Sequence, residues 1–156
     1  MNARPTLAWP ISGASPGQAP RALVLDSNIV LDLFVFADPH AAALRQLLGQ
    51  GGLDWIATQA MRDELACVLR YAHLQPRLAF HGLDAAAVLA AFDAGARLVA
   101  APARARYVCK DGDDQKFIDL AAAHAAVLLS KDKAVLRLTK RLATLGADVA
   151  AAIALA

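Results

Sequence analysis

The chain has 156 residues, of which 58% are hydrophobic and 6% aromatic, and its formal net charge is +2. This length predicts one domain, large enough to bury a core without disulfide bonds or structural metals. Two cysteines give no indication of a disulfide scaffold or a zinc cluster. No signal peptide or membrane-spanning run is recognisable, so we expect a protein of the reducing cytoplasm that does not bind the membrane.

Positive charge is concentrated in one part of the sequence. Residues 103–141 hold nine Lys and Arg and five Asp, whereas residues 1–102 hold seven basic and eight acidic residues. A local basic surplus is compatible with a phosphate-bearing partner, although small surpluses are also common on ordinary protein surfaces.

The first twenty residues differ in composition from the rest of the chain. Residues 1–20 contain four of the seven prolines, with glycine and serine and no hydrophobic period. This composition predicts a disordered or loosely docked tail. The single domain is then expected over residues 21–156.

Short apolar runs and helical patterns alternate from residue 21 onward. The expected elements in the first half of the chain are a strand at 22–26, helices at 28–36 and 39–49, a strand at 53–57, a helix at 59–71 and an irregular stretch or bent helix at 73–82. The second half is expected to have a helix at 84–95, a strand at 97–100, a loop at 102–112, a helix at 113–125, a strand at 126–130, a helix at 132–146 and a last strand within 147–155. Asp38, Thr58 and Asp84 stand where N-caps are expected. The alternation predicts an α/β fold, a three-layer α/β/α sandwich with a central, mostly parallel sheet.

Acidic residues fall near the carboxyl ends of the expected strands, where open parallel sheets bind ligands. Asp26 ends the first strand and Asp132 follows the fourth. Asp113 and Asp114 begin the helix that leads into the fourth strand. Taken singly, each of these residues is more easily explained as a helix cap or a surface charge.

Glu64 has apolar residues three and four positions before and after it in the expected helix 59–71. A carboxylate on such a stripe is costly unless it is paired or binds a cation. The alternative to a ligand role is a buried salt bridge, with Arg62 or Arg70 as partner.

Several carboxylates at one place repel one another and stay ionised together only with a compensating cation. Hard oxygen ligands suit Mg²⁺ or Mn²⁺, and Mg²⁺ usually adds substrate phosphates to its ligands. The sequence therefore indicates a metal-dependent site that acts on a phosphate ester.

Four motifs carry a family resemblance: LVLDSNIVLDLF, MRDEL, KDGDDQKFIDLA and LLSKDKAVL. In order and spacing they resemble the PIN-domain ribonucleases, most closely the toxin components of toxin–antitoxin systems, over about residues 21–145. The resemblance implies a PIN-like fold and an endonuclease that hydrolyses single-stranded RNA with one or two Mg²⁺ or Mn²⁺ ions. It also implies a cognate antitoxin and a homodimer as partners.

The resemblance assigns roles to individual residues. Its acidic quartet, both catalytic and metal-binding, corresponds to Asp26, Glu64, Asp114 and Asp132. Asp113 is an alternative ligand beside Asp114, and Asn28 and Ser130 match the polar residues that support the first and fourth acids.

Three positions depart from the family pattern: Ser27 replaces threonine, Gly112 replaces proline and Lys131 replaces a small residue. Lys131 would either pair with a carboxylate and weaken metal binding, or help to hold a phosphate.

Basic residues near the last acid are candidates for binding nucleic acid. In one continuous helix, Lys133, Arg137, Lys140 and Arg141 would share a face. The full set is Lys131, Lys133, Arg137, Lys140, Arg141, Arg104, Arg106 and Lys110. These residues would contact phosphates, and Tyr107 is a candidate for stacking on an unpaired base. An ordinary solvated surface is the alternative.

Two other functions compete with the nuclease. A catalytically degenerate module would bind RNA or a partner protein, and it would lack metal-dependent hydrolysis of any phosphodiester. A phosphatase with Asp26 as nucleophile would usually show Asp-x-Asp, but position 28 is Asn.

Overall fold

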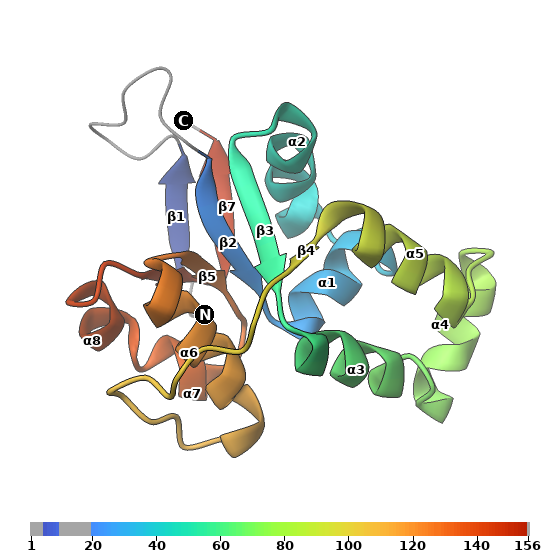
Figure 1. The fold of residues 1–156 in the computed structure, drawn as a ribbon. Helices are drawn as coiled ribbons and strands as arrows, with labels where there is room; N and C mark the ends of the chain where they lie inside the picture. The colour runs from blue at the N-terminus through green and yellow to red at the C-terminus, as the bar shows by residue number, and fades with distance from the viewer. Residues whose placement is uncertain (1–4, 10–19, 156) are drawn as a thin grey trace.

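The structure, a computed structural model, describes residues 5–9 and 20–155, and strands alternate with helices along most of the chain (Figure 1). The strands are β1 (Thr6–Trp9), β2 (Arg21–Leu25), β3 (Leu53–Ala57), β4 (Arg97–Leu98), β5 (Val127–Leu129), β6 (Asp148–Ala150) and β7 (Ala152–Leu155). The α-helices are α1 (Ser27–Phe34), α2 (Ala42–Gln50), α3 (Gln59–Val68), α4 (Gln75–Phe80), α5 (Ala85–Gly95), α6 (Gln115–His124), α7 (Lys133–Leu136) and α8 (Thr139–Ala143). Short 3₁₀ helices are η1 (Pro39–Ala41), η2 (Ala72–Leu74) and η3 (Gly112–Asp114).

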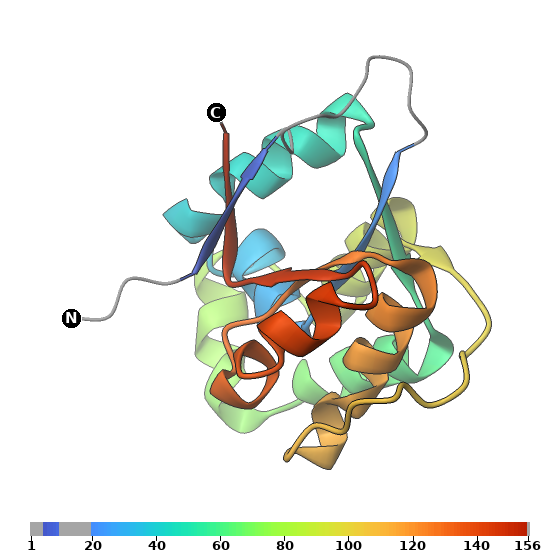
Figure 2. The same cartoon turned by 90° about the vertical axis from the view of Figure 1, so that its left-hand side faces the viewer.

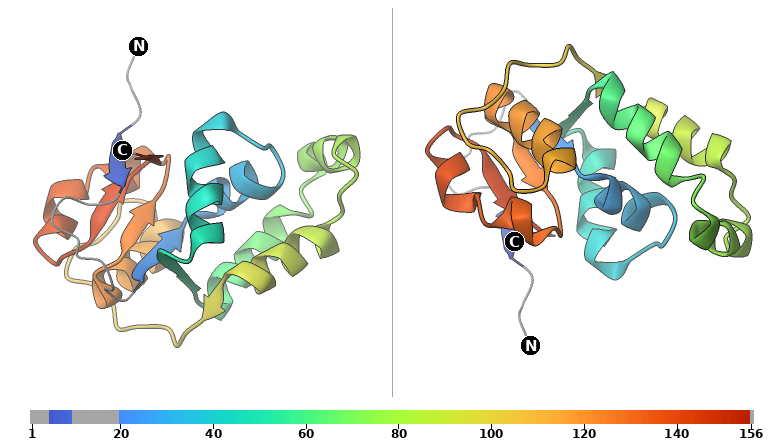
Figure 3. Two further views of the ribbon diagram at one scale, coloured as in Figure 1. Left: turned by 90° about the horizontal axis from the view of Figure 1, so that it is seen from above. Right: turned by 90° about the horizontal axis from the view of Figure 1, so that it is seen from below.

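The central sheet has five parallel strands in the order β4-β3-β2-β5-β6. Its middle strand β2 carries Leu23, Val24 and Leu25, all buried, as a strand covered on both faces requires. Helices α6 and α8 lie on one side of the sheet, and α1, α2, α3 and α5 lie on the other (Figure 3). The predicted α/β/α sandwich with a mostly parallel sheet is confirmed.

A second, two-stranded parallel sheet pairs β1 with β7, and the two strands run side by side in Figure 2. The backbone amides of Ala151 and Ala152 both donate to the carbonyl oxygen of Pro5. The expected tail of residues 1–20 therefore includes one strand that docks on the end of the chain. Its residues 1–4 and 10–19 lie outside the described part of the structure.

One expected helix and the last expected strand are each divided in two. The prediction of an unbroken helix over 132–146 is wrong, because α7 ends at Leu136 and α8 begins at Thr139. The hydroxyl of Thr139 donates to the carbonyl oxygen of Leu136 at 2.6 Å, a bond that competes with continuation of the helix. The strand expected within 147–155 is likewise β6 and β7, separated at Ala151.

The packing of α6 fixes the residues that precede it. Phe117, Ile118, Leu120 and Ala121 are almost fully buried, and this face packs against β2 and β5. The start of α6 and η3 are thereby held near the carboxyl ends of these strands.

Among the described residues no single helix is long and apolar enough to span a membrane. One bent pair of helices, Ala72–Phe80 with Ala85–Gly95, meets that test only by length and composition.

Candidate metal centre

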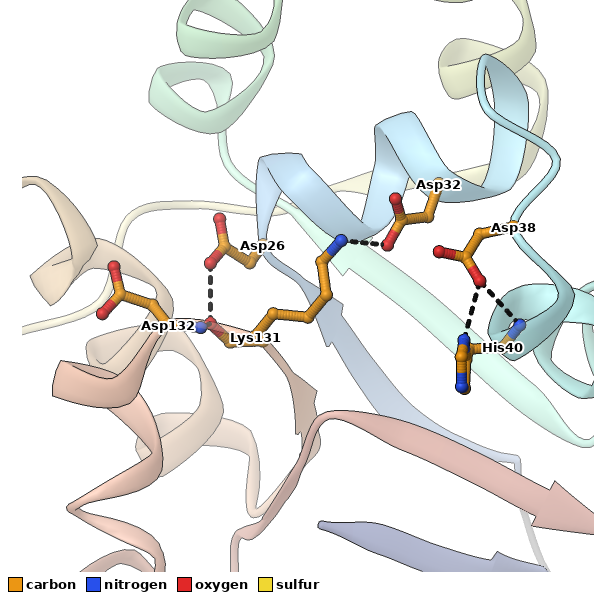
Figure 4. A network of polar contacts seen from close by, with 7 residues as sticks. Asp26, Asp32, Asp38, His40, Lys131 and Asp132 are labelled. Carbon is orange, nitrogen blue, oxygen red and sulfur yellow. Dashed lines mark hydrogen bonds and ion pairs between the residues drawn. The ribbon is translucent and has the colours of Figure 1, made fainter. Parts of the chain in front are cut away.

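The carboxyl ends of β2 and β5 place two polar residues side by side. Leu25 pairs with Leu129 across these strands, so the next residues, Asp26 and Ser130, are neighbours. Both are buried, and the Ser130 hydroxyl donates to Asp26 Oδ2 at 2.7 Å. The Ser130 hydroxyl also accepts a hydrogen bond from the backbone amide of Asp132 at 3.1 Å. Ser130 thus connects the first and the fourth acid of the predicted quartet, Asp26 and Asp132. Figure 4 shows these two carboxylates beyond the ends of the strands.

Asp132 is the N-cap of α7, and its Oδ1 accepts from the backbone amide of Ala134 at 2.8 Å. Asp132 therefore does cap a helix, which was the simpler of the two explanations for this residue. A carboxylate has a second oxygen, however, and Asp132 lies beside two further carboxylates. One ligand oxygen from each of Asp111, Asp114 and Asp132 lies within 4.8 Å of the others.

Asp114 is the most deeply buried member of this acidic group. It is only 8% exposed, at the junction of η3 and α6. Its Oδ2 is buried and has no hydrogen-bond partner among the described residues. A buried carboxylate oxygen without a partner is costly, which is the expected feature of an oxygen that binds a cation.

The electrostatics of the group favour a bound cation. Burial raises the pKa of Asp114 to about 8, assisted by the hydrogen bond to Asp132 and by the charges of Asp26, Asp132 and Asp111. The pKa of Asp26 is also raised, chiefly by burial, and the hydrogen bond from Ser130 partly opposes this shift. Carboxylates in this state lose their protons together only if a positive charge compensates them. The residues therefore fit a hard divalent cation such as Mg²⁺ or Mn²⁺.

Glu64 lies near this group but has partners of its own. Lys116 Nζ lies 2.9 Å from Glu64 Oε1, and the Ser27 hydroxyl donates to Glu64 Oε2 at 2.7 Å. The Glu64 side chain is 27% exposed. The alternative of a buried salt bridge is therefore right in that Glu64 forms an ion pair. The partner is Lys116, however, and both side chains are partly exposed, while Arg62 pairs with Asp93. Glu64 is close enough to Asp26 for its charge to raise the pKa of Asp26.

Asp113 does not join the acidic group. It is exposed, and its backbone amide donates to Asp111 Oδ1 at 3.0 Å. Sequence reasoning offered Asp113 and missed Asp111, which caps η3. The spacing of three between Asp111 and Asp114 could have identified it, because residues three apart share one side of a helical turn.

Lys131 is directed away from the acidic group. Its Nζ lies 2.5 Å from Oδ2 of Asp32, a buried residue of α1 (Figure 4). Of the two roles considered for Lys131, pairing with a carboxylate is therefore observed, but the partner lies outside the predicted quartet. Asp32 was missed, although Val35 and Phe36 three and four positions later place it on an apolar stripe as well.

The other candidates for binding nucleic acid lie on the surface. Lys133, Arg137, Lys140 and Arg141 are exposed but are divided between α7, α8 and the break between them. Their single helical face is therefore not present. Arg104, Arg106 and Lys110 are exposed in the segment between β4 and η3.

Two further polar residues complete the surroundings of the site. Asn28 is exposed in the first turn of α1. The hydroxyl of Tyr107, a half-buried residue, lies 3.4 Å from that of Thr144.

A family model for the PIN domain matches residues 22–134, which include Asp111 and all four acids of the predicted quartet. The chain belongs to the PIN-domain family. PIN domains are generally nucleases and usually bind divalent metals, so a nuclease-type hydrolase fold with an acidic cluster is established for this chain. A search of curated proteins found no match.

Proposed function

We propose that this PIN domain is a Mg²⁺- or Mn²⁺-dependent ribonuclease that cleaves single-stranded RNA internally. One observation carries the proposal: the unpartnered Oδ2 of buried Asp114, within reach of the Asp111 and Asp132 carboxylates and close to Asp26. A cation is the partner that would satisfy this oxygen and compensate the charge of the group.

Asp26, Asp111, Asp114 and Asp132 would hold one or two ions. A bound divalent cation lowers the pKa of a coordinated water and neutralises charge on the phosphate. The protein fixes the positions of the ligands: Ser130 orients Asp26, and the Ala134 amide orients Asp132. Glu64, held by Ser27 and Lys116, adds a carboxylate at the side of Asp26.

The substrate proposal rests on charge and on the family. Lys133 directly follows Asp132, and like Arg137, Lys140 and Arg141 further along the chain it is exposed. Exposed cations bind a phosphate backbone without sequence preference. The rest of the proposal rests on the family resemblance. We propose on that ground that the substrate is RNA and that the protein is the toxin of a type II toxin–antitoxin pair with a cognate antitoxin. On the same ground we propose a homodimer and a cytoplasmic location.

A second candidate function is a catalytically degenerate PIN-fold module that binds RNA or a partner protein. The observation that favours it is the Lys116–Glu64 ion pair, because a lysine already compensates one acid of the quartet. The Lys131–Asp32 pair argues the other way, since it keeps the unusual lysine away from the acidic group.

Cleavage of a labelled circular single-stranded RNA, with Mg²⁺, Mn²⁺ or EDTA, separates these functions. A circle has no ends, so only an endonuclease linearises it. We expect linear product with either metal, none with EDTA, and none with Asp114→Asn.

Asp113→Asn is the matched control, because it removes the same charge one residue away but outside the acidic group. Activity in this variant together with loss in Asp114→Asn would support the assignment. An intact circle under all conditions, with no metal binding by calorimetry, would favour the degenerate module.

A further inference from the structure

A pocket of about 400 Å³ opens beside the metal centre, between α1, α3 and the segment that follows α3. Asn28 and Leu31 of α1 and Val68 of α3 line it. Asn28 directly follows Ser27, and Val68 is one helical turn after Glu64, the residue to which Ser27 donates. The pocket thus begins about one turn of helix, ~5.4 Å, from Glu64, whose charge acts on Asp26 at the acidic site.

Aromatic and cationic side chains form the outer wall of the pocket. Tyr71 is 50% exposed, and its ring centroid lies 5.7 Å from that of His73. The Arg77 guanidinium lies 5.3 Å from the centroid of the Phe36 ring. Flat faces of this kind stack on unpaired bases, and the exposed amide of Asn28 has the donor and acceptor that read a base edge.

The charge of the surrounding segment matches a phosphate-bearing chain. Residues 65–83 contain two arginines and two histidines but no Asp or Glu, although Glu64 and Asp84 flank them. A second pocket of about 420 Å³ shares His73 and Arg77 with the first and adds Phe80, which is 83% exposed. Aromatic rings alternating with cations along a groove are the arrangement by which single strands are bound.

We propose that this pocket, the base pocket, receives the unpaired base of a nucleotide next to the phosphate that is cleaved. Tyr71 provides the stacking face, Asn28 contacts the base edge, and Arg77 lies beside the backbone that continues toward Phe80. This inference rests on the proposed function and specifies how that site would hold single-stranded RNA.

The test is the affinity of the protein, in EDTA, for a fluorescent single-stranded RNA and for an abasic strand of the same length. Removing one stacking face typically weakens binding by about 5- to 100-fold. We therefore expect Tyr71→Ala to bind the RNA that much more weakly and the abasic strand as the wild type does. Tyr71→Phe retains the ring and should retain the affinity, which separates stacking from a change of fold.

Leu98→Ala is the matched control, because Leu98 is 47% exposed, close to the 50% of Tyr71, but lies on β4. It should bind both strands as the wild type does. Arg77→Ala should weaken binding of both strands alike, since it removes a charge that both backbones meet.

If Tyr71→Ala binds both strands like the wild type while the wild type cleaves RNA, the base pocket is refuted and the proposed function stands. That result would leave the pocket to a peptide of a partner protein. If the wild type binds neither strand and cleaves no RNA, the proposed function fails and the base pocket fails with it.

Discussion

Replacing Asp114 by asparagine should stabilise the metal-free protein at alkaline pH. The folded state raises the pKa of Asp114 from 3.8 to about 8. The stability that the folded protein gains by holding the Asp114 proton more tightly is therefore fully present below the unfolded pKa of 3.8. It is lost as pH rises from about 4 through about 8, because the unfolded chain releases the proton first. Asparagine has no proton to release, so the variant lacks this loss.

The magnitude follows from the size of the shift. About four pKa units at about 1.4 kcal/mol each would correspond to about 6 kcal/mol. Burial is the largest cause of the shift, and repulsion from neighbouring carboxylates adds to it. Asp111 is exposed and Asp132 partly so, and solvent and salt therefore reduce the free energy that the shift represents. We expect the variant to be more stable than the wild type by about 1–3 kcal/mol at alkaline pH.

Urea denaturation in EDTA across this pH range measures the effect. The difference in the free energy of unfolding between the two proteins should be small near pH 4, close to the unfolded pKa of Asp114. It should be largest at pH 9, above the folded pKa of about 8. Mn²⁺ should then raise the melting temperature of the wild type but not of the variant. A variant that is less stable than the wild type at every pH would refute the electrostatic reasoning.

Three further predictions concern Ser130, Asp32 and Gly146. Ser130→Ala removes the hydroxyl that orients Asp26, so affinity for Mn²⁺ measured by calorimetry should fall by about 10- to 100-fold. Asp32→Asn frees Lys131 to approach the acidic group, so Mn²⁺ affinity should fall, and adding Lys131→Met should restore it. Gly146→Ala forces a side chain onto a residue with φ of +84°, so unfolding in urea should show a loss of about 1 kcal/mol.

Each of these has an outcome that would contradict it. Unchanged Mn²⁺ affinity in Ser130→Ala would mean that Asp26 needs no hydrogen bond from this hydroxyl. Mn²⁺ affinity as low in the double variant as in Asp32→Asn alone would show that Asp32 acts through the fold and not through Lys131. Wild-type stability in Gly146→Ala would show that the turn after α8 relaxes to accept a side chain.

Capping and the strand ends could be read from the sequence because they depend on near neighbours along the chain. Asp38 and Asp84 accept hydrogen bonds from His40 and Ala87, as N-caps should. The side chain of Thr58 stands at the expected N-cap of α3 but makes no capping hydrogen bond. Such local rules also placed Asp26 and Asp132 after buried strands.

The choice of partners could not be read in this way, because it depends on which elements the fold packs together. Lys116 and Glu64 are far apart in the chain and meet because α6 and α3 meet at the same edge of the sheet. The preference for Asp111 over Asp113 depends on how the 3₁₀ turn η3 is oriented.

By itself, the sequence determined the order of the elements, the parallel sheet and the presence of acids at its carboxyl edge, since these follow from hydrophobic period and strand direction. The tertiary structure alone decided which carboxylates share the site and where the last helix breaks. It also decided that Lys116 pairs with Glu64 and Lys131 with Asp32. The physical reason is range: period and capping act over a few residues, whereas burial and charge pairing depend on everything that packs around a side chain.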